Sequence, residues 1–270
     1  TNLFSAFNCN FNKVIIDMEA NINCDLGETS PHCSSENDPK LLTIINTANV
    51  ACGYHAGDEP TMRRTIQIAM KNNVSIGVHP SFNDKENFGR KRVSLEPKEL
   101  KYLVTEQIEL FDKICSEEGY PMTHVKPHGA MNNMACESYE MSKTIGEAIK
   151  EYNPELIYMV GAKTEMEKAG LDLKLKIACE VFADRNYEDN GLLFSRTKSD
   201  ALITDPEEAL KHTIKMIEEQ AINCKSGKII PCQVDTICLH GDGKTAVSLA
   251  SRLREGLIKE GINLKKLDQL

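Results

Sequence analysis

Residues 48–58 read ANVACGYHAGD and place a strand, a loop and the start of a helix in direct succession. The apolar run at the beginning is typical of a buried strand, and Gly53 and Gly57 permit the tight turns of a loop. Asp58 follows where a side chain can cap the first turn of a helix. His55 stands between the two glycines, where a hydrophobic core has no use for an imidazole. The stretch therefore predicts a strand-loop-helix unit with a polar group at the end of its strand.

The same order recurs along the chain. Apolar, β-rich runs alternate with helical patterns, and these runs are residues 19–26, 48–54, 74–80, 122–128, 156–162, 175–183 and 234–242. Such alternation predicts a parallel sheet with right-handed crossovers, and seven units without a linker favour a closed or nearly closed (β/α) barrel of the TIM-like α/β class. A doubly wound sheet is the alternative.

Several helix starts carry capping signals. Asp38-Pro39 and Asp205-Pro206 each place a capping side chain before a proline at the first helical position, and Ser94 is a further candidate. Residues 1–18 precede the regular pattern and are predicted to be an N-terminal extension, so that residues 19–270 form a single barrel domain. Residues 221–233 predict a hairpin inserted before the last strand.

The composition argues against two classes of partner. A net charge of −8 without a basic block disfavours nucleic acid, and no apolar run approaches the roughly 18 residues of a membrane span. The ten cysteines form no C-x-x-C motif, so we expect free thiols in a reducing cytoplasm. Cys24 and Cys52 lie beside polar motifs and could be nucleophiles, although a buried strand cysteine is the commoner case.

Six of the seven predicted strands end in charged or imidazole-bearing residues. In a parallel barrel the carboxyl ends of the strands meet at one mouth, where the active site is built. The polar residues expected there are Asn23, Asp25, Glu28, His55, Asp58, His79, Lys126, His128, Glu180, Asp184, Arg185, His240 and Asp242, and the loop after His79 adds Arg90. We therefore predict one shared polar site at this mouth.

The motif KPHG places Lys126 and His128 two residues apart, so both side chains share one face of an extended chain. They could address the same bound group. The structural alternative is that Lys126 pairs with Glu180 or Asp184 inside the barrel. His124 is expected to point in a different direction from both.

Carboxylate and imidazole groups at strand ends are also common metal ligands. No helical H-x-x-x-H or H-E-x-x-H motif fixes a ligand spacing, so a bound divalent metal and a metal-free acid/base cluster both stay open. The candidate ligands are Asp25, His55, His79 and His240. The phosphate-loop motif G-x-x-x-x-G-K-[ST] is missing, so the spacing alone does not predict nucleotide binding.

The strand-end motifs resemble, in content and in order, those of the LamB/YcsF family. They are NINCDLGE (21–28), TANVACGYHAGD (47–58), GVHPSF (77–82) with FGRK (88–91), HVKPHGA (124–130), EVFADRNY (180–187) and DTICLHGDG (235–243). The resemblance runs from about residue 19 to about residue 262. Several motifs in a fixed order are more specific than any one of them.

The resemblance implies a seven-stranded barrel similar to that of polysaccharide deacetylases, and ATP-dependent hydrolysis of the lactam 5-oxo-L-proline to L-glutamate. It further implies ATP with Mg²⁺ as cofactor and two further 5-oxoprolinase subunits as partners. Catalytic roles would fall to Asp25, His55, Lys126, His128, His240 and Asp242. Substrate or phosphate binding would fall to Asn23, Glu28, Asn49, Asp58, His79, Arg90, Glu180, Asp184 and Arg185. Lys126 and Arg90 are expected to neutralise the substrate carboxylate or a phosphate.

The chain departs from the family pattern at Asn21, Thr29-Ser30, Ser81 and Asn132, which concerns the substrate side more than the strand-end core. Two other functions stay open. One is a metal-dependent deacylase or deacetylase that acts on a carbohydrate or another amide on the same barrel. The other is a non-catalytic subunit of a lactam-utilisation complex.

Overall fold

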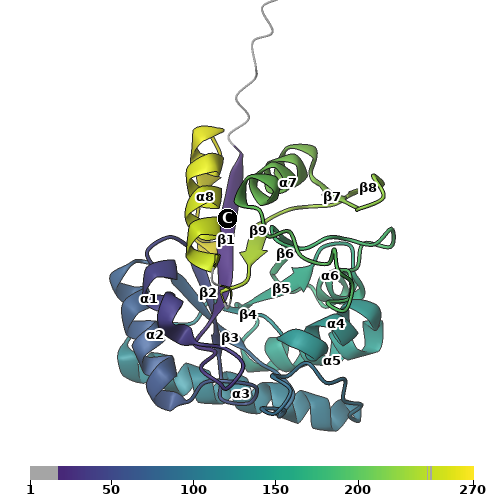
Figure 1. Cartoon of the computed structure of the whole chain (residues 1–270). Helices are drawn as coiled ribbons and strands as arrows, with labels where there is room; N and C mark the ends of the chain where they lie inside the picture. The colour runs from purple at the N-terminus through teal and green to yellow at the C-terminus, as the bar shows by residue number, and fades with distance from the viewer. Residues whose placement is uncertain (1–17, 242, 244) are drawn as a thin grey trace, which may run out of the picture.

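Seven parallel strands close into a barrel in the computed structural model, which describes residues 18–241, 243 and 245–270 (Figure 1). The strands are β1 (Glu19–Leu26), β2 (Thr47–Ala51), β3 (Ser75–His79), β4 (His124–Val125), β5 (Ile157–Gly161), β6 (Ile177–Phe182) and β9 (Thr236–Leu239). Each pairs with the next, and β1 also pairs with β9, which closes the ring. The predicted barrel is confirmed, whereas residues 1–17 of the predicted extension and Asp242 lie outside the described residues.

Helices connect the strands and surround them in Figure 1. They are η1 (Ser35–Asn37), α1 (Asp38–Leu41), α2 (Glu59–Lys71), α3 (Pro97–Glu118), α4 (Gly129–Glu137), α5 (Tyr139–Tyr152), α6 (Glu165–Asp172), α7 (Pro206–Glu219), α8 (Ala246–Lys259) and η2 (Leu267–Gln269). Strand β10 (Asn263–Leu264) extends the sheet beside β1. The predicted hairpin is confirmed as β7 (Ala221–Asn223) and β8 (Ile229–Pro231), which pair antiparallel. None of the helices in the described part of the chain is both long enough and apolar enough to cross a bilayer.

Two of the predicted helix caps are confirmed. The Asp58 carboxylate accepts a hydrogen bond from the main-chain N–H of Thr61 at 2.9 Å, at the start of α2. The Asp205 carboxylate accepts from the N–H of Glu208 at 2.8 Å, at the start of α7. Each bond satisfies one of the amide groups that the first turn of a helix leaves without a partner.

The other two predicted caps are wrong. Asp38 is the first residue of α1 rather than its cap, because its carboxylate accepts instead from the main-chain N–H of Gly27 at 2.8 Å. Helix α3 is capped by Glu96 and not by Ser94. Pro97 takes the first helical position, and the Glu99 side chain accepts from the N–H of Glu96, as in a capping box.

The barrel separates an apolar layer from a polar interior. On β1, Ile22 and Leu26 are buried in the hydrophobic core cluster that unites strands and helices. The alternate residues contact other strands inside the ring: Asn21 donates to Thr47 Oγ1 at 2.9 Å, and Asn23 donates to Thr236 Oγ1 at 2.8 Å. The interior of this barrel is therefore filled by hydrogen-bonded polar side chains, where branched apolar residues usually dominate.

Gly57 holds the loop of the opening motif against the end of β1. Its φ is +75°, and an added Cβ would lie 2.4 Å from the main-chain oxygen of Gly27. We predict that Gly57→Ala lowers the free energy of unfolding by about 1–3 kcal/mol more than Gly119→Ala does. Gly119 is the matched control, because its φ is +70° and no atom lies within 4 Å of its added Cβ. Urea unfolding measures both; equal losses would contradict the close contact.

Candidate active site at the barrel mouth

Lys126 lies at the centre of the polar interior, just after β4. Its ammonium group lies 2.9 Å from Asp25 Oδ1 and 2.8 Å from Glu180 Oε1, and its side chain is almost fully buried. Burial alone would lower the pKa of Lys126, but Asp25 and Glu180 raise it above its usual range, so it stays charged. The sequence offered pairing with Glu180 or Asp184 as one alternative; Glu180 is a partner, and the second partner is Asp25.

The layer beneath Lys126 positions Asp25. Asn49 donates to Asp25 Oδ1 and to Asn23 Oδ1, both at 2.8 Å. Asn49 in turn accepts from His124 Nε2 at 2.8 Å, so His124 points into the interior, as Lys126 does. The expectation that His124 points elsewhere is wrong, because residues two apart on an extended chain share a face. Burial lowers the pKa of His124 to about 3, which keeps it neutral.

Two further imidazoles at the mouth are fixed in orientation by main-chain carbonyl groups. His79 Nδ1 lies 2.6 Å from the carbonyl oxygen of Lys126, and His128 Nε2 lies 2.9 Å from that of Phe88. A carbonyl oxygen only accepts, so both of these nitrogens carry a proton. The remaining nitrogens, His79 Nε2 and His128 Nδ1, face each other at 3.0 Å.

This facing pair requires a cation. In neutral rings both nitrogens would present lone pairs to each other, which repel. The carboxylate of Glu28 lies beside them, with Oε1 3.2 Å from His128 Nδ1 and 3.9 Å from His79 Nε2. Either a proton on one ring or a bound metal ion resolves this arrangement, and carbonyl groups that fix the outer nitrogens of metal-binding histidines are typical of metal sites.

His55 completes a group of four buried residues whose ligand atoms lie within 4.8 Å of one another: Glu28, His55, His79 and His128. Its Nε2 lies 3.1 Å from Glu28 Oε1, and its ring stacks on His128 with centroids 3.8 Å apart. Burial and the neighbouring His128 lower the pKa of His55 to about 3. Its buried Nδ1 has no hydrogen-bond partner among the described residues. A neutral imidazole beside a carboxylate fits the donor set of zinc or a similar divalent ion.

Glu28 is ionised in this site. Burial would raise its pKa, but hydrogen bonds with His128 and His55 hold the pKa below its usual range. The same holds for Asp25, whose pKa burial would raise and His79 and Lys126 lower. Asp25 Oδ2 lies 3.4 Å from His79 Nε2, so this second carboxylate borders the same group. The site therefore carries two negative charges beside the facing imidazoles.

Phe88 covers the group of Glu28, His55, His79 and His128, which we call the imidazole group. Phe88 is not among the predicted site residues. Its ring meets those of His55 and His128 edge to face, with centroids 5.5 Å and 5.3 Å away. Its φ of 56° is unusual for a bulky residue, and the following Gly89 leaves no room for a Cβ against Ser81 and His128. The FGRK motif is the available signal, but its charge points to Arg90 and not to Phe88. The Arg90 guanidinium lies 4.8 Å above the Phe88 ring.

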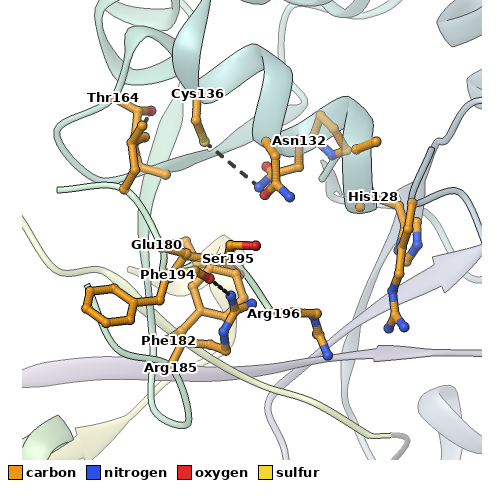
Figure 2. Close-up of a pocket in the computed structure, with 18 of the residues that line it drawn as sticks. His128, Asn132, Cys136, Thr164, Glu180, Phe182, Arg185, Phe194, Ser195 and Arg196 are labelled. Carbon is orange, nitrogen blue, oxygen red and sulfur yellow. Dashed lines mark hydrogen bonds between the residues drawn. The ribbon is translucent and has the colours of Figure 1, made fainter. Parts of the chain in front are cut away.

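A cavity of about 640 Å³ opens above these groups (Figure 2). Of the predicted site residues, it is lined by Asp25, Glu28, His79, Arg90, Lys126, His128, Glu180, Arg185 and His240. His55, Asn23 and Asn49 lie behind or beneath this lining, and Asp58 caps α2 outside it. Asn132, one departure from the family pattern, also lines the cavity, whereas Asn21 lies at the interior position described above.

His240 belongs to a different part of the mouth. Its Nδ1 lies 2.7 Å from Asp184 Oδ2, and Arg196 donates to its Nε2 at 2.5 Å. Both nitrogens are therefore engaged away from the group around Glu28. Of the candidate ligands from the sequence, the structure brings together His55 and His79, with Asp25 at the border. It adds Glu28 and His128, for which the family resemblance implies substrate binding and catalysis.

The two cysteines considered as nucleophiles are buried strand-end residues. Burial raises the pKa of Cys52 to about 12 and raises that of Cys24 well above its usual range. A thiol in such surroundings is not ionised at neutral pH and is a poor nucleophile. Neither lines the cavity. Both cysteines therefore fit the interpretation as buried structural residues and not as nucleophiles.

Comparison with known proteins agrees with this architecture. The LamB/YcsF family model matches residues 20–270. The chain belongs to the LamB/YcsF family. Among curated LamB/YcsF relatives, the 5-oxoprolinase A subunit of Staphylococcus epidermidis is 43% identical over 250 residues, which is 93% of this chain and 99% of that protein. The corresponding 5-oxoprolinase protein of Clostridium beijerinckii is 42% identical over 252 residues, again 93% and 99%.

Solved structures give the same result for the fold. The lactam utilization protein of Thermus thermophilus superposes with a TM-score of 0.85 at 31% identity and covers 92% of this LamB/YcsF chain and 99% of its own. A structure titled T48 deacetylase with substrate shares the fold alone, with a TM-score of 0.52 at 13% identity over 94% and 90% of the two chains. LamB/YcsF and deacetylase barrels are thus similar in architecture.

We predict that the purified chain binds one divalent ion such as Zn²⁺ at the imidazole group. Titration calorimetry of the metal-free protein measures the affinity, and His79→Gln and His128→Gln should each weaken it by roughly tenfold to a hundredfold or more. His212→Gln in α7 is the control, because His212 lies outside this group. The prediction would be wrong if the chain took up no metal and nuclear magnetic resonance spectra at pH 7 showed a proton on both nitrogens of His128. A proton, and not a metal ion, would then lie between the facing nitrogens.

We also predict that two buried imidazoles make the fold less stable in mild acid. The pKa values of His55 and His124 are lowered to about 3, so both rings stay neutral in the folded chain and take up a proton on unfolding below about pH 6.5. Stability present above that pH is lost as the pH falls. Each ring should contribute up to about 1.4 kcal/mol per pH unit between roughly pH 6 and pH 4.5. The pKa of Asp38 is raised to about 7, so protonation of this carboxyl group gives an opposite contribution in the same range. Urea unfolding at several pH values in an Asp38→Asn background therefore tests the prediction, and a flat profile in that background would contradict it.

Proposed function

We propose that the chain hydrolyses the lactam amide of 5-oxo-L-proline to L-glutamate as the A subunit of an ATP-dependent 5-oxoprolinase. The observation that carries the proposal is the Asp25 carboxylate, which is paired with Lys126, lies beside His79 of the group Glu28, His79 and His128, and is open to the cavity. An amide is hydrolysed by groups that activate water and stabilise charge on the carbonyl oxygen. The names of the relatives, which are matched over nearly their whole length, support the choice of substrate.

Asp25 is the proposed proton acceptor for the attacking water. Lys126 and Asn49 hold its Oδ1, which leaves Oδ2 directed toward His79. Lys126 keeps Asp25 ionised and stays protonated itself, so it orients and does not transfer the proton. A divalent ion held by Glu28, His79 and His128 would supply Lewis-acid chemistry and lower the pKa of water. His55 orients Glu28 through their hydrogen bond.

We assign the ATP dependence to the assembly with two further subunits. Phosphorylation of the lactam oxygen by ATP with Mg²⁺ would release ADP and create a good leaving group. Water would then add to the ring carbon, and cleavage of the C–N bond, with a proton delivered to the nitrogen, would open the ring to γ-glutamyl phosphate. A second water would hydrolyse this acyl phosphate to L-glutamate and phosphate. The relatives are named as one subunit of an enzyme, which supports partners. The free thiols of Cys24, Cys52 and Cys115 agree with a reducing cytoplasm as the compartment.

A second candidate is a metal-dependent deacylase or deacetylase of another amide. The same buried cation site favours it, because a metal ion and a carboxylate base suffice to hydrolyse an unactivated amide. This activity would persist without ATP and partner subunits and would be lost on treatment with a chelator. The proposed 5-oxoprolinase would instead require ATP and release ADP in proportion to L-glutamate.

We predict that Asp25→Asn lowers oxoproline-dependent L-glutamate formation by roughly a hundredfold or more, because the amide removes the proton acceptor. The assay contains ATP, Mg²⁺ and the partner subunits. Asp205→Asn is the matched control, because Asn also caps a helix and Asp205 lies at the start of α7 outside the cavity. Unchanged turnover in Asp25→Asn would favour a non-catalytic subunit instead.

A further inference from the structure

Arg185 places a buried positive charge in the cavity wall. It follows β6 and is only 6% exposed, and its guanidinium donates to the main-chain carbonyl oxygens of Phe194 at 2.5 Å and Ala201 at 3.4 Å. The adjacent carboxylate, Asp184, is engaged by His240 at 2.7 Å. Among the residues that the structure describes, Arg185 therefore has hydrogen bonds to carbonyl groups but no ion pair.

A second guanidinium adds to this charge. Arg196 lines the same side of the cavity, and Figure 2 shows both arginines and Phe194 across the cavity from Asn132 and Cys136. Burial and the nearby Arg196 lower the pKa of Arg185 to about 10 and the adjacent Asp184 raises it in part, so Arg185 stays charged at neutral pH. Arg196 is positioned by His240, which is itself held by Asp184. A buried cation near a like charge is costly unless an anion joins it.

Lys126, a second buried cation at the mouth, does not fill this role. Lys126 is charged, but its ammonium group is already paired with Asp25 and Glu180. The expected binding of a substrate carboxylate by Lys126 stays a prediction, and it would compete with these two ion pairs. The imidazole group is bordered by the carboxylates of Glu28 and Asp25, which would repel an anion. One part of the cavity is thus lined by the carboxylates of Glu28 and Asp25 and suits a cation. A separate part is lined by Arg185 and Arg196 and suits an anion.

We propose that Arg185, with Arg196 beside it, is the subsite for an oxyanion group of the substrate, the carboxylate of an anionic amide whose scissile bond lies at Asp25. This inference rests on the proposed function and deepens it. A planar guanidinium matches a carboxylate in geometry and stays protonated, so it fixes both the charge and the orientation of the ligand. A phosphoryl group offers the same chemistry and is distinguished by the test.

The test compares binding of 5-oxo-L-proline with 2-pyrrolidinone, the same ring without the carboxylate, by titration calorimetry on the full chain. The wild-type chain should bind the carboxylated lactam at least roughly tenfold more tightly. Arg185→Met should weaken binding of 5-oxo-L-proline by roughly tenfold to a hundredfold and leave 2-pyrrolidinone unchanged. Arg185→Lys keeps the positive charge but not the planar guanidinium, so its affinity for 5-oxo-L-proline should lie between those of the wild-type chain and Arg185→Met. This variant also provides the test if Arg185→Met does not fold.

Arg92→Met is the matched control, because Arg92 lines the same cavity but its guanidinium is paired with Glu137. Equal binding of the two lactams by the wild-type chain, or an equal loss in Arg92→Met, would overturn the subsite. Inorganic phosphate that displaces 5-oxo-L-proline from the wild-type chain but not from Arg185→Met would support the subsite and identify a phosphoryl group as its occupant.

The same series separates this inference from the proposed function. N-acetylglycine and N-methylacetamide form a second pair of amides that differ in a carboxylate. If the complete assembly does not turn over 5-oxo-L-proline, the proposed function fails. The subsite still stands if the chain prefers the anionic member of both pairs and Arg185→Met abolishes the preference. If the assembly turns over 5-oxo-L-proline but the chain shows no such preference, the proposed function is supported and the proposed subsite is wrong.

Discussion

The contact of the Lys126 ammonium with Asp25 and Glu180 is the interaction on which the site depends. It joins β4, β1 and β6 across the barrel. Lys126 and Glu180 are almost fully buried there, and Asp25 borders the cavity. Leaving either carboxylate buried without this cation would be strongly unfavourable, so the three side chains fix one another. Because Asp25 is held through Oδ1, its second oxygen has one direction to face, toward the imidazoles of the mouth.

The imidazole group depends on backbone position in the same way. Carbonyl groups of Lys126 and Phe88 set which nitrogen of His79 and His128 carries the proton, and those carbonyls belong to the end of β4 and to the loop after β3. A shift of either segment would change the protonation of the rings as well as their place. The positive φ of Phe88 and the lack of room beside Gly89 are the local cost of holding that loop against the rings.

Much of the fold followed from pattern, because alternation of apolar runs with helical periodicity leaves few arrangements of strands. The strand-end rule likewise brought Asp25, Lys126 and His128 to one mouth. What failed depended on contacts between distant segments. The Asp-Pro pattern predicts a cap at Asp38, whereas its carboxylate accepts a hydrogen bond from the N–H of Gly27. Phe88 covers the site through a loop conformation that has no periodic signal. The grouping of Glu28 and His128 rather than His240 around one point needed the actual geometry.

The two parts of the cavity are supported by different kinds of structure, and this difference bears on specificity. Asp25, His79 and Lys126 stand at the ends of barrel strands, where pairing on both sides restricts movement. Arg196 and the carbonyls that hold Arg185 lie instead in the long connection between β6 and α7. Such a connection tolerates substitution and insertion more readily than a strand. Within one barrel, the chemistry can therefore stay fixed while this connection determines which amide is recognised, as proposed for the oxyanion at Arg185.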